Sequence, residues 1–173
     1  MEEFEIRTAN PNDAPAIAAV LAAAFIEYRP LYTAEGYAAT TPGEAVIRNR
    51  FAEGTTWVAV VAGKIVGTVS VVSQPDSLSQ RECLSQPDSL PRLESLYIRS
   101  MAVLPEARAH RLGERLLSEI EQYALAHGFR RLTLSTTPFL DRAIRLYEKY
   151  GFTRCGSDDL FGTPLITMAK EIG

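Results

Sequence analysis

The sequence predicts a single α/β domain of the α+β type over residues 1–173, with a mixed, mostly antiparallel sheet of six to seven strands flanked by four helices. Two observations indicate this class. Segments rich in β-branched residues are interspersed with segments whose apolar residues recur at helical spacing. The length of 173 residues and the 46% share of hydrophobic residues suit one domain with one core.

The N-terminal half has the predicted order strand, helix, helix, strand, strand. An alternating first strand leads into a turn that caps an alanine-rich helix, and Pro30 ends that helix. Gly, Thr and Pro residues predict a loop before the second helix. Two runs of Val, Ile and Thr around Ala62 and Gly63 predict an antiparallel hairpin. The expected bounds are 4–7 (strand), 14–28 (helix), 31–42 (loop), 44–52 (helix), 56–62 and 64–73 (strands).

The C-terminal half has the predicted order strand, helix, strand, helix, strand, strand. Its first helix has leucines and an isoleucine on one side, and Gly128 closes it. Its second helix ends at Gly151, where a final pair of strands follows. The expected bounds are 96–103 (strand), 112–127 (helix), 131–135 (strand), 140–150 (helix), 152–155 and 165–170 (strands).

A tandem duplication lies between the two halves. The six residues from Ser73 to Leu78 recur from Ser85 to Leu90. The segment is polar and carries prolines, so residues 73–95 are expected to form a long loop between two strands. Two interpretations stay open: an inert insertion, or a lid over the substrate.

Charge and composition argue against several classes of partner. The formal net charge of −3 weighs against nucleic acid, because phosphate backbones favour a basic face. No apolar run approaches the roughly 18 residues of a membrane span, and the acidic N-terminus is unlike a signal peptide, so we expect no membrane partner and a cytoplasmic location. Cys83 and Cys155 lie far apart without CxxC spacing, so no metal site is expected.

The stretch from Ile98 to Leu117 could bind an anion. A strand ends at Val103, Pro105 breaks it, and a short loop with arginines leads into a helix that begins near Leu112. The first N–H groups of a helix are free of intrahelical partners and lie at its positive end, which favours phosphate.

A second stretch, from Ala143 to Phe152, carries two tyrosines on one helix face, Tyr147 and Tyr150. A tyrosine hydroxyl in a cleft can protonate a leaving thiolate. The alternative is that both rings only pack in the core.

Together these stretches resemble the GNAT superfamily of acetyl-CoA-dependent N-acetyltransferases. The family motif [QR]-x-x-G-x-[GA] after a strand of the form L-x-V-x-P is similar to residues 101–105 followed by 108–113 here. The family's later alanine, LY and GF are similar to Ala143, Leu146-Tyr147 and Gly151-Phe152. The resemblance covers nearly the whole chain and implies a GNAT-like fold.

The resemblance also implies roles for individual residues. Tyr147 would be the general acid for the departing thiolate. Backbone groups of Met101 and Val103 would pair with the pantetheine arm, and the strand from Met101 to Val103 would supply an N–H to the thioester oxygen. The implied acetyl-CoA-binding residues are Met101, Ala102, Val103, Arg108, Ala109, His110, Arg111, Leu112, Gly113 and Glu114.

The chain departs from the family pattern at three places. Arg111 stands where the motif has its first glycine, and Leu140 stands where an asparagine is common. The strand from Tyr97 to Val103 has no carboxylate to serve as general base. Glu94, Glu27, His110 or a water chain could accept the proton of the amine.

The implied reaction is transfer of an acetyl group from acetyl-CoA to a primary amine of a small molecule or peptide, by direct attack in a ternary complex. Neither cysteine lies in the two motifs, so no covalent enzyme intermediate is expected. A homodimer is compatible with the fold class. Two alternatives are a non-catalytic acyl-CoA-binding or sensing module, and a phosphate loop for another nucleotide.

Overall fold

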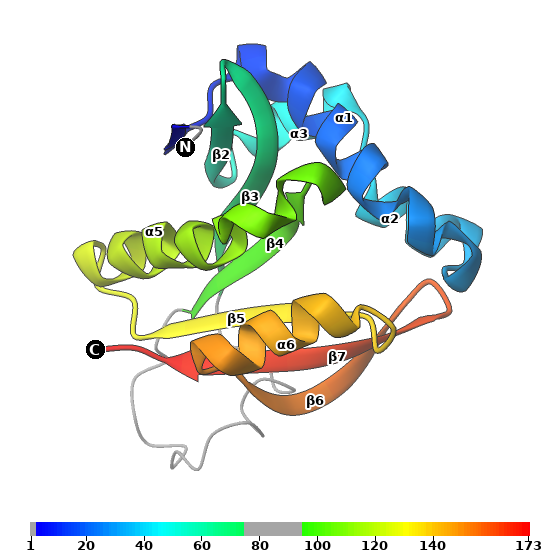
Figure 1. Ribbon diagram of the computed structural model, residues 1–173. Helices are drawn as coiled ribbons and strands as arrows, with labels where there is room; N and C mark the ends of the chain where they lie inside the picture. The colour runs from blue at the N-terminus through cyan, green and yellow to red at the C-terminus, as the bar shows by residue number, and fades with distance from the viewer. Residues whose placement is uncertain (1–2, 75–94) are drawn as a thin grey trace.

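Seven strands form one sheet in the part of the chain that the structure, a computed structural model, describes: residues 3–74 and 95–173. The strands are β1 (Phe4–Thr8), β2 (Gly54–Val61), β3 (Lys64–Gln74), β4 (Ser95–Val103), β5 (Arg131–Thr136), β6 (Thr153–Leu160) and β7 (Thr163–Glu171). Their order across the sheet is β1-β2-β3-β4-β5-β7-β6 (Figure 1). Neighbouring strands are antiparallel except β4 and β5, which are parallel. The mixed, mostly antiparallel sheet is therefore confirmed.

Helices precede the central strands and connect the later ones. The α-helices of the described residues are α1 (Ala14–Phe25), α2 (Ala34–Thr40), α3 (Glu44–Arg50), α5 (Leu112–Ala126) and α6 (Asp141–Tyr150). Three 3₁₀ helices join them: η1 (Pro11–Asp13), η2 (Ile26–Leu31) and η3 (Pro105–His110). Each predicted helix is present, and α2 is one more than the sequence predicted.

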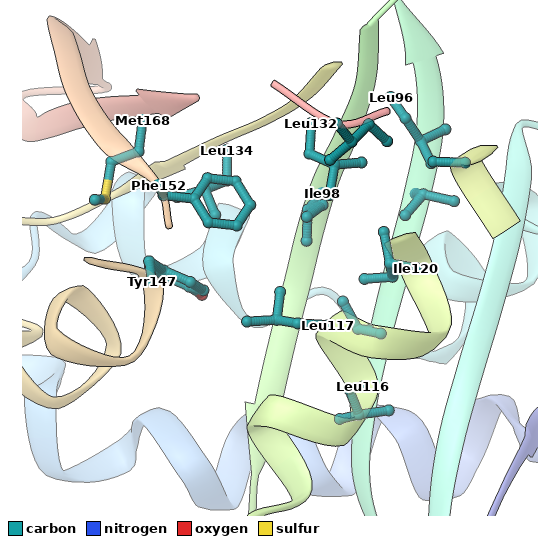
Figure 2. Packing of buried hydrophobic residues seen from close by; sticks show 14 of the residues in the cluster. Leu96, Ile98, Leu116, Leu117, Ile120, Leu132, Leu134, Tyr147, Phe152 and Met168 are labelled. Atoms are coloured by element: carbon teal, nitrogen blue, oxygen red, sulfur yellow. The ribbon is translucent and has the colours of Figure 1, made fainter. Parts of the chain in front are cut away.

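Two hydrophobic clusters lie on the two faces of the sheet. One joins α5 and α6 to side chains such as Trp57 and Ile98, and Figure 2 shows part of it. The other joins α1 and α3 to side chains such as Val58 and Ala102. Adjacent residues of β2 enter different clusters because successive side chains of a strand point to opposite faces.

The prediction of a loop over residues 31–42 was wrong. Thr33 begins helix α2 there, because its side chain accepts a hydrogen bond from the N–H of Gly36 at 3.0 Å and so caps the first turn. The helix before it also ends differently: α1 stops at Phe25, and Pro30 lies inside the 3₁₀ helix η2 rather than after an α-helix.

The last two strands are longer than their sequence suggested. Gly156, Ser157, Asp158 and Asp159 have low strand propensity, yet all four pair with β7. The hairpin forms because Phe161 and Gly162 both take positive φ angles, 49° and 88°, as a two-residue turn of this kind requires.

We expected no apolar run long enough to span a membrane, and this expectation was also wrong. The helical run Pro11–Leu31 is 21 residues long and apolar enough to cross a membrane by length and composition alone. Its α1 part buries Ile17, Val20 and Leu21 in the second cluster, which is the behaviour of a core helix. Most of the duplicated segment, residues 75–94, lies outside the described residues, so the choice between lid and inert insertion stays open.

Candidate active site

The parallel strands β4 and β5 pair over only three residues and then diverge. The pairs are Leu96 with Leu132, Tyr97 with Thr133, and Ile98 with Leu134. Beyond Ile98, β4 continues to Val103 along β3, and β5 continues along β7. Figure 1 shows the opening between the two strands. Backbone groups on the β5 side of this part of β4 therefore have no partner in β5.

An irregularity in β4 accompanies the divergence. Arg99 pairs with Ser70 and Ala102 with Thr68, so two residues of β4, Ser100 and Met101, oppose one residue of β3. Ser100 has a φ of 53°, in the left-handed region. This arrangement is a β-bulge, and a bulge bends its strand. It turns the end of β4 away from β5.

A cavity of about 550 Å³ occupies the opening. The end of β4 forms one wall, and helices such as η2, α3, α5 and α6 contribute to the others. The lining includes Tyr28, Tyr32, Arg50, Tyr97, Arg99, Ser100, Met101, Ala102, Val103, Arg108, Arg111, Gly113, Glu114, Leu146 and Tyr147. The volume is typical of a site for a small molecule.

The N-terminus of α5 lies at this cavity, as the sequence predicted. Its first intrahelical bond runs from the N–H of Arg115 to the carbonyl of Arg111 at 3.2 Å, so the earlier N–H groups have no acceptor in the helix. Arg111 and Gly113 both line the cavity. Arg111 has a φ of 55° and a ψ of 27°, the left-handed conformation that glycine adopts most readily.

The predicted cofactor-binding residues divide into two groups. Met101, Ala102, Val103, Arg108, Arg111, Gly113 and Glu114 line the cavity. Ala109, His110 and Leu112 are not among the lining residues. The side chain of Leu112 is fully buried in the second cluster, so only its backbone N–H could serve a ligand.

Gly113 lines the cavity and also packs closely against Leu146 on α6. A Cβ atom at this position would lie 2.7 Å from Cδ2 of Leu146 on α6. The lack of a side chain therefore lets the first turn of α5 approach α6.

Two ion pairs hold the walls in place. The guanidinium of Arg108 donates to Oε1 of Glu27 at 2.9 Å and ties η3 to η2. Lys149 Nζ donates to Oε1 of Glu114 at 2.7 Å and ties α6 to α5. The hydrogen bond from Lys149 lowers the pKa of Glu114, so this carboxylate is charged but paired at neutral pH.

Tyr147 is the predicted acid, and the structure brings it to the cavity. Its side chain is 7% exposed, and its hydroxyl lies 3.7 Å from the sulfur of Met101 on the bulged part of β4. Figure 2 shows the ring pointing from α6 toward Leu117 of α5. Burial raises the pKa of Tyr147 well above its ordinary value, so the phenol stays protonated at physiological pH.

Tyr150 lies elsewhere, although it is three residues away on the same helix. It is not among the lining residues, and the ammonium of Lys170 lies 4.2 Å from its ring centroid. Burial, together with its hydrogen bond to Glu121, raises the pKa of Tyr150 to about 12. The core-packing alternative therefore holds for Tyr150.

Of the predicted general bases that lie in the described part of the chain, neither Glu27 nor His110 lines the cavity. Glu27 is paired with Arg108, and His110 is exposed. Glu94 lies outside the described residues. Glu114 is the one carboxylate among the described lining residues.

Another part of the cavity wall contains residues that the sequence did not single out. Arg50 Nη1 donates to Oγ of Ser100 at 2.9 Å, and both residues line the cavity. Tyr32 packs edge-on against Phe139 at 4.9 Å between ring centroids, and burial raises its pKa. Tyr28 lines the cavity together with Tyr32, and neither residue lies in the two motifs of the sequence.

A threonine contact fastens this wall to the last hairpin. The N–H of Thr33 donates to Oγ1 of Thr163 at 3.0 Å, and the Thr33 hydroxyl donates to the carbonyl of Phe161 at 2.8 Å. The contact fixes the start of α2 relative to the hairpin formed by β6 and β7.

Metal ligands do not gather at the cavity. Among residues 3–74 and 95–173, no group of three or more His, Cys, Asp or Glu side chains could hold a metal ion.

Known proteins with the same fold are acetyltransferases. An acetyltransferase of the GNAT family from Streptococcus pneumoniae is 25% identical and superposes with a TM-score of 0.65, over 99% of this chain and 100% of that one. The PaiA N-acetyltransferase from Thermoplasma acidophilum, solved in complex with coenzyme A, is 16% identical with a TM-score of 0.73, over 98% of this chain and 99% of that one.

Relatives by sequence carry the same activity in their names. The uncharacterized N-acetyltransferase YjgM of Escherichia coli is 29% identical over 143 residues, which are 82% of this chain and 77% of YjgM. Three vertebrate relatives are longer proteins, and the chain spans only 34% to 39% of their length. The model of the Acetyltransferase (GNAT) family matches residues 19–152, so the chain belongs to that family.

Proposed function

We propose that the protein transfers an acetyl group from acetyl-CoA to a primary amine by direct attack in a ternary complex. One observation carries the proposal. A single cavity joins the free N-terminus of α5, the bulged end of β4 and the buried hydroxyl of Tyr147. The N-terminus of α5 would bind an anion, the backbone of β4 would donate hydrogen bonds, and Tyr147 would act as the acid.

The residues present fit acetyl-CoA, which would supply the acyl group as a thioester. The free N–H groups at the start of α5 would hold its diphosphate, helped by the charge of Arg111. The unpaired backbone of β4 from Met101 to Val103 would bond the pantetheine arm. A backbone N–H there would also stabilise the negative charge that develops on the thioester oxygen.

The transfer needs two proton movements. The amine nitrogen attacks the carbonyl carbon, the C–N bond forms and the C–S bond breaks. Tyr147 donates its proton to the departing sulfur, and water accepts the proton lost by the amine. Water is assigned this role because Glu114 is the one carboxylate among the described lining residues and it is paired with Lys149.

The test is to incubate the protein with acetyl-CoA and a panel of primary amines. We expect one equivalent of free thiol for each acetylated amine, and no change in the mass of the protein. Calorimetric titration should show binding of coenzyme A and none of ATP or NAD. Binding without thiol release on any amine would support the sensing module instead.

A further inference from the structure

The cavity contains a positive charge that the described protein does not balance. Arg50 is the last residue of α3, and it lines the cavity in a half-buried position. Its hydrogen bond goes to a neutral hydroxyl, that of Ser100. No carboxylate of the described residues lies within ion-pair distance of its guanidinium.

The neighbouring charges do not remove this imbalance. Arg99 also lines the cavity and pairs with the carboxylate of Glu53. Burial lowers the pKa of Arg50, repulsion from Arg99 lowers it further, and Glu53 opposes the shift only in part. Two guanidinium groups and one carboxylate leave one excess positive charge at this end of the cavity.

The position of the charge limits where its partner can lie. Ser100 belongs to the bulge and directly precedes Met101, whose sulfur lies beside the Tyr147 hydroxyl. Arg50 and Tyr147 therefore contact neighbouring residues of the bulge, and both line the same cavity. An anion that balances Arg50 would therefore occupy this cavity together with the reacting groups.

We propose that the acceptor is a compact amine that also carries a carboxylate, and that Arg50 binds this carboxylate. A carboxylate brings one negative charge, which matches the net charge of Arg50, Arg99 and Glu53. The planar guanidinium also matches a carboxylate geometrically, through paired N–H donors. The inference rests on the proposed function and names its substrate class.

The first test compares amino acids with their carboxamides as acceptors. Each pair shares its skeleton and differs in the negative charge. We expect kcat/KM to be at least about tenfold higher for the acids, since a hydrogen bond to a charged group contributes about 1.5–3 kcal/mol. Equal kcat/KM for acids and amides would overturn the inference, as would a preference for aminoalkyl phosphonates over the acids.

The second test replaces Arg50 with Gln. We expect KM for the acids to rise about tenfold to a hundredfold while kinetics with the amides stay within about twofold. Arg48→Gln is the matched control, because Arg48 lies on the same helix but pairs with Glu44 away from the cavity. We expect it to change neither substrate class. An equal loss for acids and amides in Arg50→Gln would assign Arg50 a structural role and overturn the inference.

The two proposals fail in different ways. Thiol release from amides as readily as from acids would overturn the carboxylate site and leave the acetyltransferase standing. Absence of thiol release from every amine would overturn both.

Discussion

The hydroxyl of Tyr147 on α6 lies 3.7 Å from the sulfur of Met101 on β4, across the opening where β4 and β5 part. A thioether is a weak acceptor, so this contact would compete only weakly with a departing sulfur for the hydroxyl proton. The opening therefore presents a protonated, buried donor beside the free backbone of β4, where we place the thioester.

Replacing Tyr147 with Phe should lower kcat about a hundredfold and leave the affinity for coenzyme A within about twofold. The ring and its packing against Phe152 remain, and the acid is lost. Single-turnover kinetics and calorimetry would measure the two effects. Tyr150→Phe is the control, because that hydroxyl lies outside the cavity, and its kcat should not change. Unchanged turnover in Tyr147→Phe would remove the acid from the mechanism.

Arg111 supports a prediction about backbone strain. Its left-handed φ of 55° costs a residue with a side chain about 1–2 kcal/mol. Arg111→Gly should therefore be more stable to urea than Arg111→Ala by about 1 kcal/mol. Equal stability of the two variants would show that the loop before α5 relaxes into another conformation.

The same two variants test the role of the guanidinium. Both lack its charge, so a phosphate contact would weaken coenzyme A binding in both by a similar factor. Calorimetric affinities at two salt concentrations would show this, because an exposed charge–phosphate contact weakens as salt rises. Unchanged affinity in both variants would leave diphosphate binding to the backbone N–H groups alone.

Local signals in the sequence predicted the cofactor end of the site. Pro105, the arginines and Gly113 lie within one short stretch, and the strand, loop and helix that they predict are the ones observed. For Tyr147, spacing alone left core packing open, and the resemblance of the stretch from Ala143 to Phe152 to the family motif singled it out. Both stretches are short, so their motifs can be recognised without knowledge of the fold.

The acceptor end could not be predicted in this way. Arg50 meets Ser100 only because α3 packs near the middle of β4, fifty residues later in the chain. The bulge at Ser100 depends on how β4 pairs with β3, and no residue type in the strand signals it. The start of α2 did carry a local signal, the cap at Thr33, but the glycine, threonine and proline around it indicated a loop.

Gly36 should tolerate alanine poorly. A Cβ atom there would lie 2.4 Å from Oγ1 of Thr163 and 3.0 Å from the carbonyl oxygen of Leu160. Gly36→Ala should disturb the contact between Thr33 and Thr163, lower the free energy of unfolding by about 1–3 kcal/mol and raise KM for the acceptor.

A second glycine provides the control for this substitution. In Gly156→Ala the new Cβ would meet only the side chain of Thr167, its partner on β7, at 3.8 Å or more, which is ordinary van der Waals contact. Its stability in urea should stay within about 0.5 kcal/mol of the parent. Equal stability of the two variants would mean that α2 can shift from the last hairpin without cost.

Asp13, which directly precedes α1, should make the free energy of unfolding of the protein depend on pH. Arg7 donates two hydrogen bonds to this carboxylate, at 2.8 and 3.0 Å, and lowers its pKa in the folded state. A carboxylate whose pKa is lower in the folded state than in the unfolded state stabilises the fold fully at pH values above its unfolded-state pKa, which is about 3.9. That stabilisation is lost as the pH falls through its folded-state pKa. Asp13→Asn should therefore lower the free energy of unfolding by about 1 kcal/mol at pH 7, and the two proteins should converge as pH falls below about 4.

Urea denaturation at pH 7, 5, 4 and 3 would measure this convergence. Glu44→Gln is a useful comparison, because the Glu44–Arg48 pair is exposed on one helix and such pairs contribute only about 0.3–0.5 kcal/mol. The Asp13 variant should therefore show the larger difference at pH 7. A difference that stays constant down to pH 3 would mean that Asp13 acts through the hydrogen bond that it accepts from the N–H of Asn10, and that its charge contributes nothing to folding.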